Sequence, residues 1–168
     1  MAVVTIKSSA ITNADASPSV LTSANVANGN LRESVGTIAA GVADSIASIY
    51  RFVRVRSSDR VSAVKLYCDA ITTGAMDVGL YRTAADGGAV VDVDLFASAQ
   101  STAAEIKTGT EIQHESGFFG LEDIEKPLWV ALGLAADPFV LYEVCGTLTA
   151  ANTGAGDVSL KVQFVSGE

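Results

Sequence analysis

Cysteine and histidine are nearly missing from this 168-residue sequence, which contains two cysteines, Cys68 and Cys145, and one histidine, His114. A disulfide-rich scaffold needs several cysteine pairs, and a zinc site needs closely spaced Cys or His ligands. The sequence therefore excludes both classes. Whether Cys68 and Cys145 pair with each other stays open, although buried free thiols are commoner in proteins made in a reducing cytoplasm.

Long apolar runs are missing as well. The longest run, Leu128 to Ala136, includes Gly133 and is far shorter than the roughly 20 residues that cross a bilayer. The N-terminal residues Met1–Lys7 lack a basic start followed by a long apolar core, which a secretory signal requires. We therefore expect no membrane partner, and we expect the protein to be made in a cytoplasm.

Basic residues are scarce, with 11 Lys and Arg against 19 Asp and Glu, and the formal net charge is −8. Binding to nucleic acid needs a concentrated basic face, so nucleic acid is not an expected partner. The bases crowd into one stretch, where Arg51, Arg54, Arg56 and Arg60 have only Asp59 against them. We predict that these four arginines contact an acidic partner surface. The alternative interpretation is a solvated strand face.

Alternation of apolar and polar residues, typical of strands with one face in a core, recurs along the chain. Val61–Asp69 alternates, and Met76–Leu80 alternates again after a turn at Thr72–Gly74, which predicts a central β-hairpin. The clearest strand is the last one, over Val158–Phe164. Turn signals recur about every ten residues. The prediction is an all-β fold, an antiparallel, jelly-roll-like β-sandwich with one or two short helical turns.

The first part of the chain differs in composition from the rest. Residues 1–45 are poor in large apolar side chains and rich in turn formers, although Leu31–Ile38 regains some strand character. We expect residues 1–45 to form a loosely structured N-terminal segment, or an arm that gains order against another surface. Residues 46–168 are expected to form the β-sandwich domain.

Four segments carry more specific expectations. Ile46–Arg56 is predicted as the first firm strand, with Val53 and Val55 on one face and Tyr50 and Phe52 on the other. Ser101–Lys107 is predicted to form a helical turn, because its Thr and Glu have capping-box spacing, and Thr110–Ser116 an edge strand. Pro127–Gly133 fits a strand or a short helix, and its terminal Pro and Gly favour the helix.

Residues that could carry chemistry are few. His114 has acidic neighbours but no nucleophile motif, and a surface histidine is the simpler interpretation. Asp92 and Asp94 alternate onto one face, where they would either share a cation or lie in solvent. Glu122, Asp123 and Glu125 could bind Ca²⁺, or could simply precede the start of a helix. Trp129, Phe118 and Phe119 could form an aromatic platform on which a sugar stacks. We predict no catalytic, cofactor-binding or metal-binding residue, and no enzyme activity.

Several stretches together resemble a group of small proteins encoded among the head genes of tailed bacteriophages and prophages. They are Tyr50–Arg56, Leu66–Ile71, Val78–Tyr81, Gly87–Phe96, Glu125–Trp129, Leu132–Leu134 and Leu148–Ala151, and the likeness spans roughly residues 30–165. The resemblance implies a virion structural protein, most plausibly a capsid decoration (cement) protein. It also implies a place on the capsid surface, the major capsid protein as partner, self-association as a dimer or trimer at a symmetry axis, and manufacture in the host bacterial cytoplasm. It supplies no active-site residues.

Two other function classes remain as alternatives. A carbohydrate-binding or tail-associated adhesion module is the second hypothesis, because β-sandwiches commonly serve as lectin domains. A small hydrolase that uses His114 or the Asp92 and Asp94 pair is the third. Under the first hypothesis, residues near the N-terminus and the Arg51–Arg60 stretch contact capsid protein.

Overall fold

The computed structural model describes residues 6–20 and 29–167. The chain divides into two compact units, Met1–Asn30 and Leu31–Glu168. Within the described part of the first unit, Ser8 is the N-cap of helix α1 (Ser9–Ala14), and its side chain accepts a hydrogen bond from the amide of Ile11. None of the residues of α1 is buried. A six-residue helix without a buried face gains little stability by itself.

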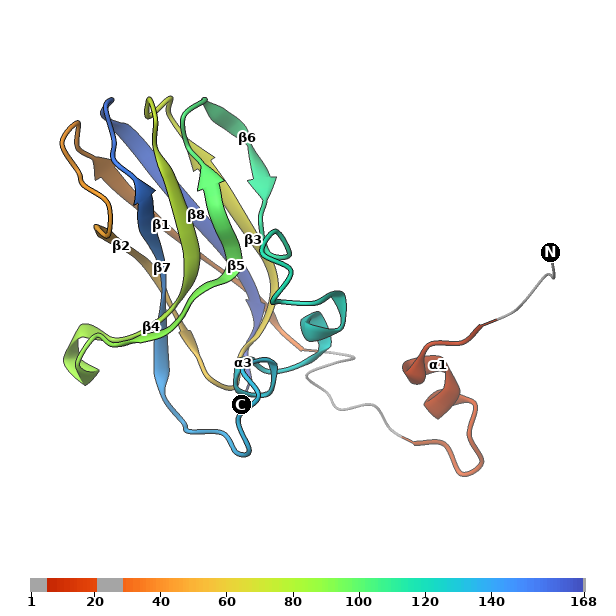
Figure 1. Ribbon diagram of the computed structural model, residues 1–168. Helices are drawn as coiled ribbons and strands as arrows, with labels where there is room; N and C mark the ends of the chain where they lie inside the picture. The colour runs from red at the N-terminus through yellow and green to blue at the C-terminus, as the bar shows by residue number, and fades with distance from the viewer. Residues whose placement is uncertain (1–5, 21–28, 168) are drawn as a thin grey trace. The chain divides into compact units, whose positions relative to one another are not determined.

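The second unit consists of two four-stranded antiparallel sheets packed face to face (Figure 1). Sheet A has the strand order β1 (Leu31–Ala40), β8 (Gly156–Val165), β3 (Arg60–Cys68), β6 (Ile106–Glu111). Sheet B has the order β2 (Ile49–Arg56), β7 (Leu141–Ala150), β4 (Ala75–Arg82), β5 (Val90–Ser101). This is the strand order of an eight-stranded jelly roll, and the predicted antiparallel β-sandwich is confirmed.

Alternation along the strands builds the core between the two layers. Val158, Leu160 and Val162 of β8 are buried, and polar side chains alternate with them on the outer face of sheet A. Sheet B contributes Met76 and Phe96, both fully buried. Burial of each large apolar side chain stabilises the fold by about 1.5–3 kcal/mol, which makes this alternation the main determinant of the sandwich.

The predicted hairpin between Val61–Asp69 and Met76–Leu80 is wrong. Both segments form strands, but β3 belongs to sheet A and β4 to sheet B, so the connection around Thr72–Gly74 crosses between the layers. The apolar faces of both strands point into the same core from opposite sides. Alternation alone cannot distinguish a crossing of this kind from a hairpin, because either one buries one face of each strand.

The predicted faces of β2 also need correction. Tyr50 and Val53 are both buried, although alternation from Tyr50 would place Val53 outside. The pairing of β2 with β7 shifts between Arg51 and Val53, which makes Phe52 the extra residue of a β-bulge. A bulge reverses the inward and outward positions that follow it. Arg51 and Arg54 therefore both reach the outer face of sheet B.

The helical predictions have mixed outcomes. The segment with Pro127 and Gly133 is helical, as favoured, with α3 (Leu128–Ala131) preceded by the 3-10 helix η2 (Leu121–Glu125). A further 3-10 helix, η1 (Ala84–Asp86), lies in the β4–β5 connection. The helical turn expected over Ser101–Lys107 is wrong, because β5 ends at Ser101 and β6 begins at Ile106. The edge strand expected over Thr110–Ser116 is β6, which ends at Glu111 and so starts and stops earlier.

The expected division at residues 45 and 46 differs from the observed one. Strand β1 pairs with β8 along its whole length, from Leu31 opposite Val165 to Ala40 opposite Gly156. The less exposed positions of β1 are Ser34, Gly36, Ile38 and Ala40, so this strand buries mostly small side chains. The β-sandwich therefore begins at Leu31, and the N-terminal segment is Met1–Asn30. No helix among the described residues is long and apolar enough to cross a membrane.

Candidate functional site

The structure brings three of the four predicted contact arginines together. Arg51, Arg54 and Arg56 lie on β2, an edge strand of sheet B, on or beside its outer face. We call these three residues the arginine strip. Arg60 does not join it, because it begins β3 in sheet A, opposite Val165. The Nε of Arg60 is buried and has no hydrogen-bond partner among the described residues.

Glu143 of β7 anchors the arginine strip. Its Oε2 accepts a hydrogen bond from Arg51 Nη1 at 2.5 Å, and its Oε1 accepts one from Arg54 Nε at 3.0 Å. Glu143 lies directly opposite Arg54 in the strand register. Burial raises the pKa of the Glu143 carboxyl, but the hydrogen bonds and the positive charges of both arginines together outweigh burial and leave this pKa below its ordinary value. The carboxylate therefore stays ionised, and one positive charge of the pair is left over.

Arg51 is held more firmly than Arg54. Its guanidinium also donates to the backbone carbonyls of Arg82 and Gly88, and it lies 5.6 Å from the ring centroid of Tyr81. The Arg54 side chain is 61% exposed. Arg51 thus has a positioning role within the sheet, whereas Arg54 presents its charge to solvent.

Replacement of Glu143 with glutamine is expected to lower the free energy of unfolding by about 1–2 kcal/mol at pH 7, because two guanidinium groups lose their counter-charge. The folded pKa of Glu143 is lowered, so its carboxylate stabilises the fold above the unfolded pKa of about 4.3, and this contribution is lost as the pH falls through the folded pKa. Urea unfolding of both proteins from pH 7 to pH 3 measures the difference. A deficit that stays constant over this range would contradict the ion-pair account.

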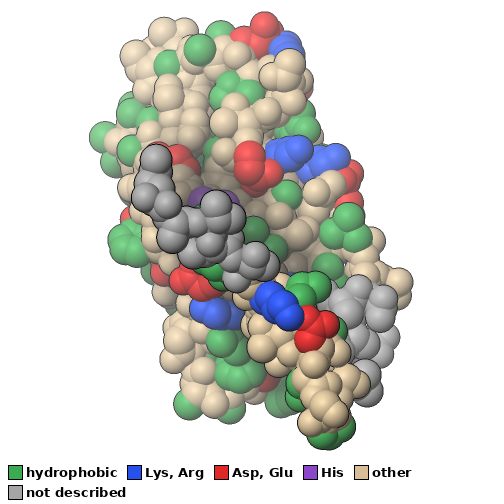
Figure 2. Space-filling model, turned by 90° about the vertical axis from the view of Figure 1, so that its right-hand side faces the viewer, with side chains coloured by type: hydrophobic (Ala, Val, Ile, Leu, Met, Phe, Trp, Pro, Cys, Tyr) green, Lys and Arg blue, Asp and Glu red, His purple; other side chains and the backbone are tan. Residues whose placement is uncertain are grey.

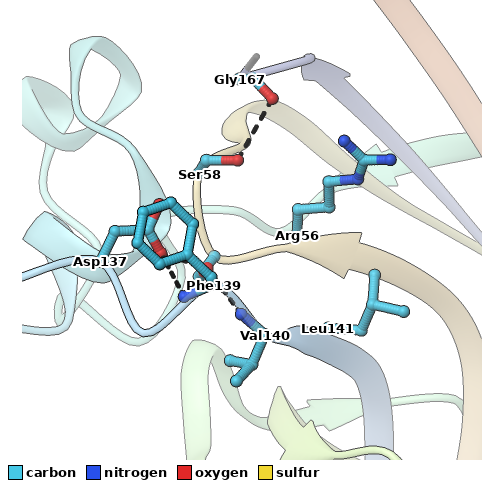
Figure 3. A pocket seen from close by; sticks show the side chains of 8 residues that line it. Arg56, Ser58, Asp137, Phe139, Val140, Leu141 and Gly167 are labelled. Atoms are coloured by element: carbon cyan, nitrogen blue, oxygen red, sulfur yellow. Dashed lines mark hydrogen bonds between the residues drawn. The ribbon is translucent and has the colours of Figure 1, made fainter.

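The strip ends in a hollow of about 310 Å³, shown in Figure 3. Leu141 lies directly opposite Arg56 in the register of β2 and β7, so the hollow continues the same edge of sheet B. Its lining combines one guanidinium and one carboxylate with apolar and small polar groups, from Arg56, Ser57, Ser58, Asp137, Phe139, Val140, Leu141 and Gly167. A smaller hollow of about 200 Å³ lies beside Arg51, Arg54 and Glu143. The arrangement suits recognition of carboxylates and apolar side chains.

On other surfaces of the molecule, positive and negative charges are mixed. On the face that Figure 2 presents, acidic and basic side chains are interspersed and form no extended basic area. The outer face of sheet A follows the same rule, since Glu33 pairs with Lys161 and accepts a hydrogen bond from Gln163. Such pairs across neighbouring strands neutralise one another and contribute little binding specificity.

The other candidate residues make contacts within the fold. His114 is partly buried, with Nδ1 2.8 Å from the carbonyl oxygen of Phe119 and its ring stacked on the Phe119 ring. The Asp92 carboxylate accepts a hydrogen bond from the amide of Asp94, and burial raises the pKa of Asp92. Asp123 accepts hydrogen bonds from the amide of Gly120 and from Lys126, which fixes the turn of η2.

The suggested aromatic platform is not assembled. Phe119 is buried and packs against Phe96, whereas Phe118 beside it is 65% exposed and Trp129 is half-buried. The described ranges contain no group of three or more His, Cys, Asp or Glu side chains placed to hold a metal ion. Both cysteines are buried and free, and burial raises the pKa of Cys145 to about 12.

Sequence reasoning missed two residues of this surface. Glu143 lies within β7, and its partnership with β2 depends on a register that no local pattern reveals. Phe139 precedes β7 and is 88% exposed. The Asp-Pro pair before Phe139 was the available signal for an exposed turn.

Solved structures with a similar fold come from bacteriophage capsids. The match to "Cyanophage Pam1 capsid asymmetric unit" has a TM-score of 0.53 and 14% identity, and covers 82% of this chain and 85% of that chain. The match to "Capsid of Ralstonia phage GP4" has a TM-score of 0.58 and 13% identity, and covers 83% of this chain and 86% of that chain. No model of a known protein family matches the sequence, and no curated protein matches it. At these identities the likeness to the two structures establishes a common fold.

Proposed function

We propose that this protein is a bacteriophage virion structural protein, a decoration (cement) protein that binds the outside of the capsid and stabilises contacts between capsomers. The observation that carries the proposal is the fold, which aligns over 82% and 83% of the chain with chains from two phage capsids. The sequence resemblance to head-gene products points the same way. A protein that works by covering a surface also needs no catalytic cluster.

The proposed partner is the major capsid protein. The molecule carries a net charge of −8, yet the arginine strip concentrates positive charge on one edge of sheet B. A strip of this kind attaches to an acidic surface and sets the orientation of binding. Self-association as a dimer or trimer at a capsid symmetry axis would multiply individually weak contacts.

The N-terminal unit, Met1–Asn30, is the proposed arm. Helix α1 buries none of its residues, and the nearby apolar side chains of Ile6 and Val20 are exposed. Such a segment gains stability when a second surface covers those groups. We therefore assign it to contact with capsid protein, together with the strip.

The direct test is binding of the purified protein to empty heads that lack it, measured by co-sedimentation. We expect saturable binding and a higher temperature of head disruption in its presence. A protein without residues 1–30 should bind more weakly and melt at the same temperature as the full chain. If the truncated chain binds as well as the full chain, residues 1–30 do not contribute to the capsid contact. If the full chain does not bind, the proposed function is wrong.

Replacement of Arg54 with glutamate is expected to weaken binding to empty heads by about tenfold or more, because it reverses the exposed charge of the strip. Arg32 on β1 is also exposed, so Arg32→Glu makes the same charge change on sheet A and serves as the matched control. Co-sedimentation at two salt concentrations measures both variants. Equal losses in the two would show that net charge, and not the strip, governs binding.

A further inference from the structure

Phe139 is presented to solvent in an unusual way. Its side chain is 88% exposed, and its backbone has a φ of +52°. Left-handed backbone is uncommon outside glycine and is strained for a bulky residue. Strain of this kind persists only where the surrounding structure enforces it, and it concentrates at functional positions.

The enforcing contacts lie on both sides of Phe139. Asp137 Oδ1 accepts hydrogen bonds from the hydroxyl of Ser57 at 2.5 Å and from the amide of Phe139 at 2.9 Å. Ser57 Oγ accepts a hydrogen bond from the amide of Val140, and the amide of Ser57 donates to the Val140 carbonyl. Ser57 itself is buried at the end of β2. The loop tip is thereby fastened to the sandwich, and its exposed ring is held ready for contact.

The positively charged Arg56 lines the same hollow as Phe139. Phe139, Val140 and Leu141 line the hollow at the end of the strip, and the Arg56 side chain extends along it (Figure 3). Asp137 already accepts two hydrogen bonds from this chain. Within the described ranges the Arg56 guanidinium forms no salt bridge, although its charge favours the ionised form of Asp59. A second copy docked about a two-fold axis centred on Arg56 would bring two Arg56 side chains together. Charge complementarity therefore favours a partner that carries a carboxylate.

We infer that Phe139 is the anchor residue of the capsid contact, and that its partner is a shell-protein segment with a large apolar side chain flanked by Asp or Glu. The apolar side chain packs on the ring and into the hollow, while the carboxylate pairs with Arg56. Aromatic residues, Phe included, and arginine are enriched in the cores of protein interfaces. Because the loop is already fastened, little conformational entropy is lost on binding. The inference rests on the proposed function and names the chemistry of its partner.

The test compares Phe139→Ala with Phe118→Ala, a matched change at an exposed phenylalanine of another loop. With empty heads as the probe, Phe139→Ala is expected to weaken binding by about tenfold or more, and Phe118→Ala by less than about twofold. Arg56→Gln is expected to weaken binding and to reduce its salt dependence. If the unmodified protein binds heads and Phe139→Ala binds equally well, this inference fails while the proposed function stands; no binding by the unmodified protein overturns both.

Two further variants distinguish the loss of the contact with the shell from a loss of folding. Phe139→Gly removes the ring and relieves the backbone strain, so it should melt no lower than the unmodified protein and still bind weakly. Asp137→Ala keeps the ring but releases the loop, and it should weaken binding less than Phe139→Gly does. Sedimentation of the isolated protein tests whether a second copy of this chain occupies the surface in place of the shell protein. If Phe139→Ala abolishes self-association and leaves the affinity for heads unchanged, the partner is a second copy and the inference is overturned.

Discussion

Replacement of Phe96 with alanine is expected to lower the free energy of unfolding by about 3–5 kcal/mol. The Phe96 side chain is fully buried in β5, and its ring centroid lies 5.4 Å from that of Phe119. The truncation leaves a cavity where sheet B meets the segment between β6 and η2. Since whole domains are stable by only about 5–15 kcal/mol, this one change removes a large share of the total.

Urea unfolding followed by near-ultraviolet circular dichroism measures the effect. Phe118→Ala removes the same number of atoms from an exposed ring and should change stability by less than about 0.5 kcal/mol. A loss below about 1 kcal/mol for Phe96→Ala would mean that this position repacks freely, contrary to the tightly filled core described above.

Replacement of Gly36 with valine is expected to lower stability by about 3 kcal/mol. Gly36 lies on β1, and a Cβ at this position would clash with the carbonyl oxygen of Phe52, the bulged residue of β2. Backbone cannot rotate aside as a flexible side chain does, so the edges of the two sheets must separate. The arginine strip lies on the displaced strand, and binding to heads should weaken along with stability.

Ala39→Val provides the control on the same strand. Ala39 is exposed, and the larger β-branched side chain is well accepted in strands, so stability should change by less than about 0.5 kcal/mol. Thermal unfolding of both variants makes the comparison. Equal stability of Gly36→Val and the unmodified protein would show that β1 and β2 need not approach each other so closely.

Much of the fold could be predicted because burial of one strand face leaves a period of two in the sequence. The strand over Val158–Phe164 was recognised for this reason, and β8 includes it completely. The pairing partners could not be predicted, since β3 and β4 show the same alternation whether they form a hairpin or cross between sheets. Strand β1 is harder to predict because its less exposed positions carry mostly small residues, such as Ser34, Gly36 and Ala40.

The candidate site was predictable in part. Clustered arginines can be seen directly in the sequence, and Arg51, Arg54 and Arg56 do lie along one strand. Arg60 could not be separated from them, because the turn at Ser57–Asp59 takes the chain to the other sheet. The outward position of Arg54 next to Arg51 depends on a bulge at Phe52 that has no local sequence signal. Contacts with Glu143 and the left-handed backbone of Phe139 arise only from the tertiary structure.

The proposed place on the capsid can be seen in an electron cryo-microscopy map of purified virions. We expect density for an eight-stranded sandwich on the outer surface of the capsid, seated with the Arg54 and Phe139 edge of sheet B against the shell. If this density is absent from the capsid, or is present only on the tail, the proposed function is wrong.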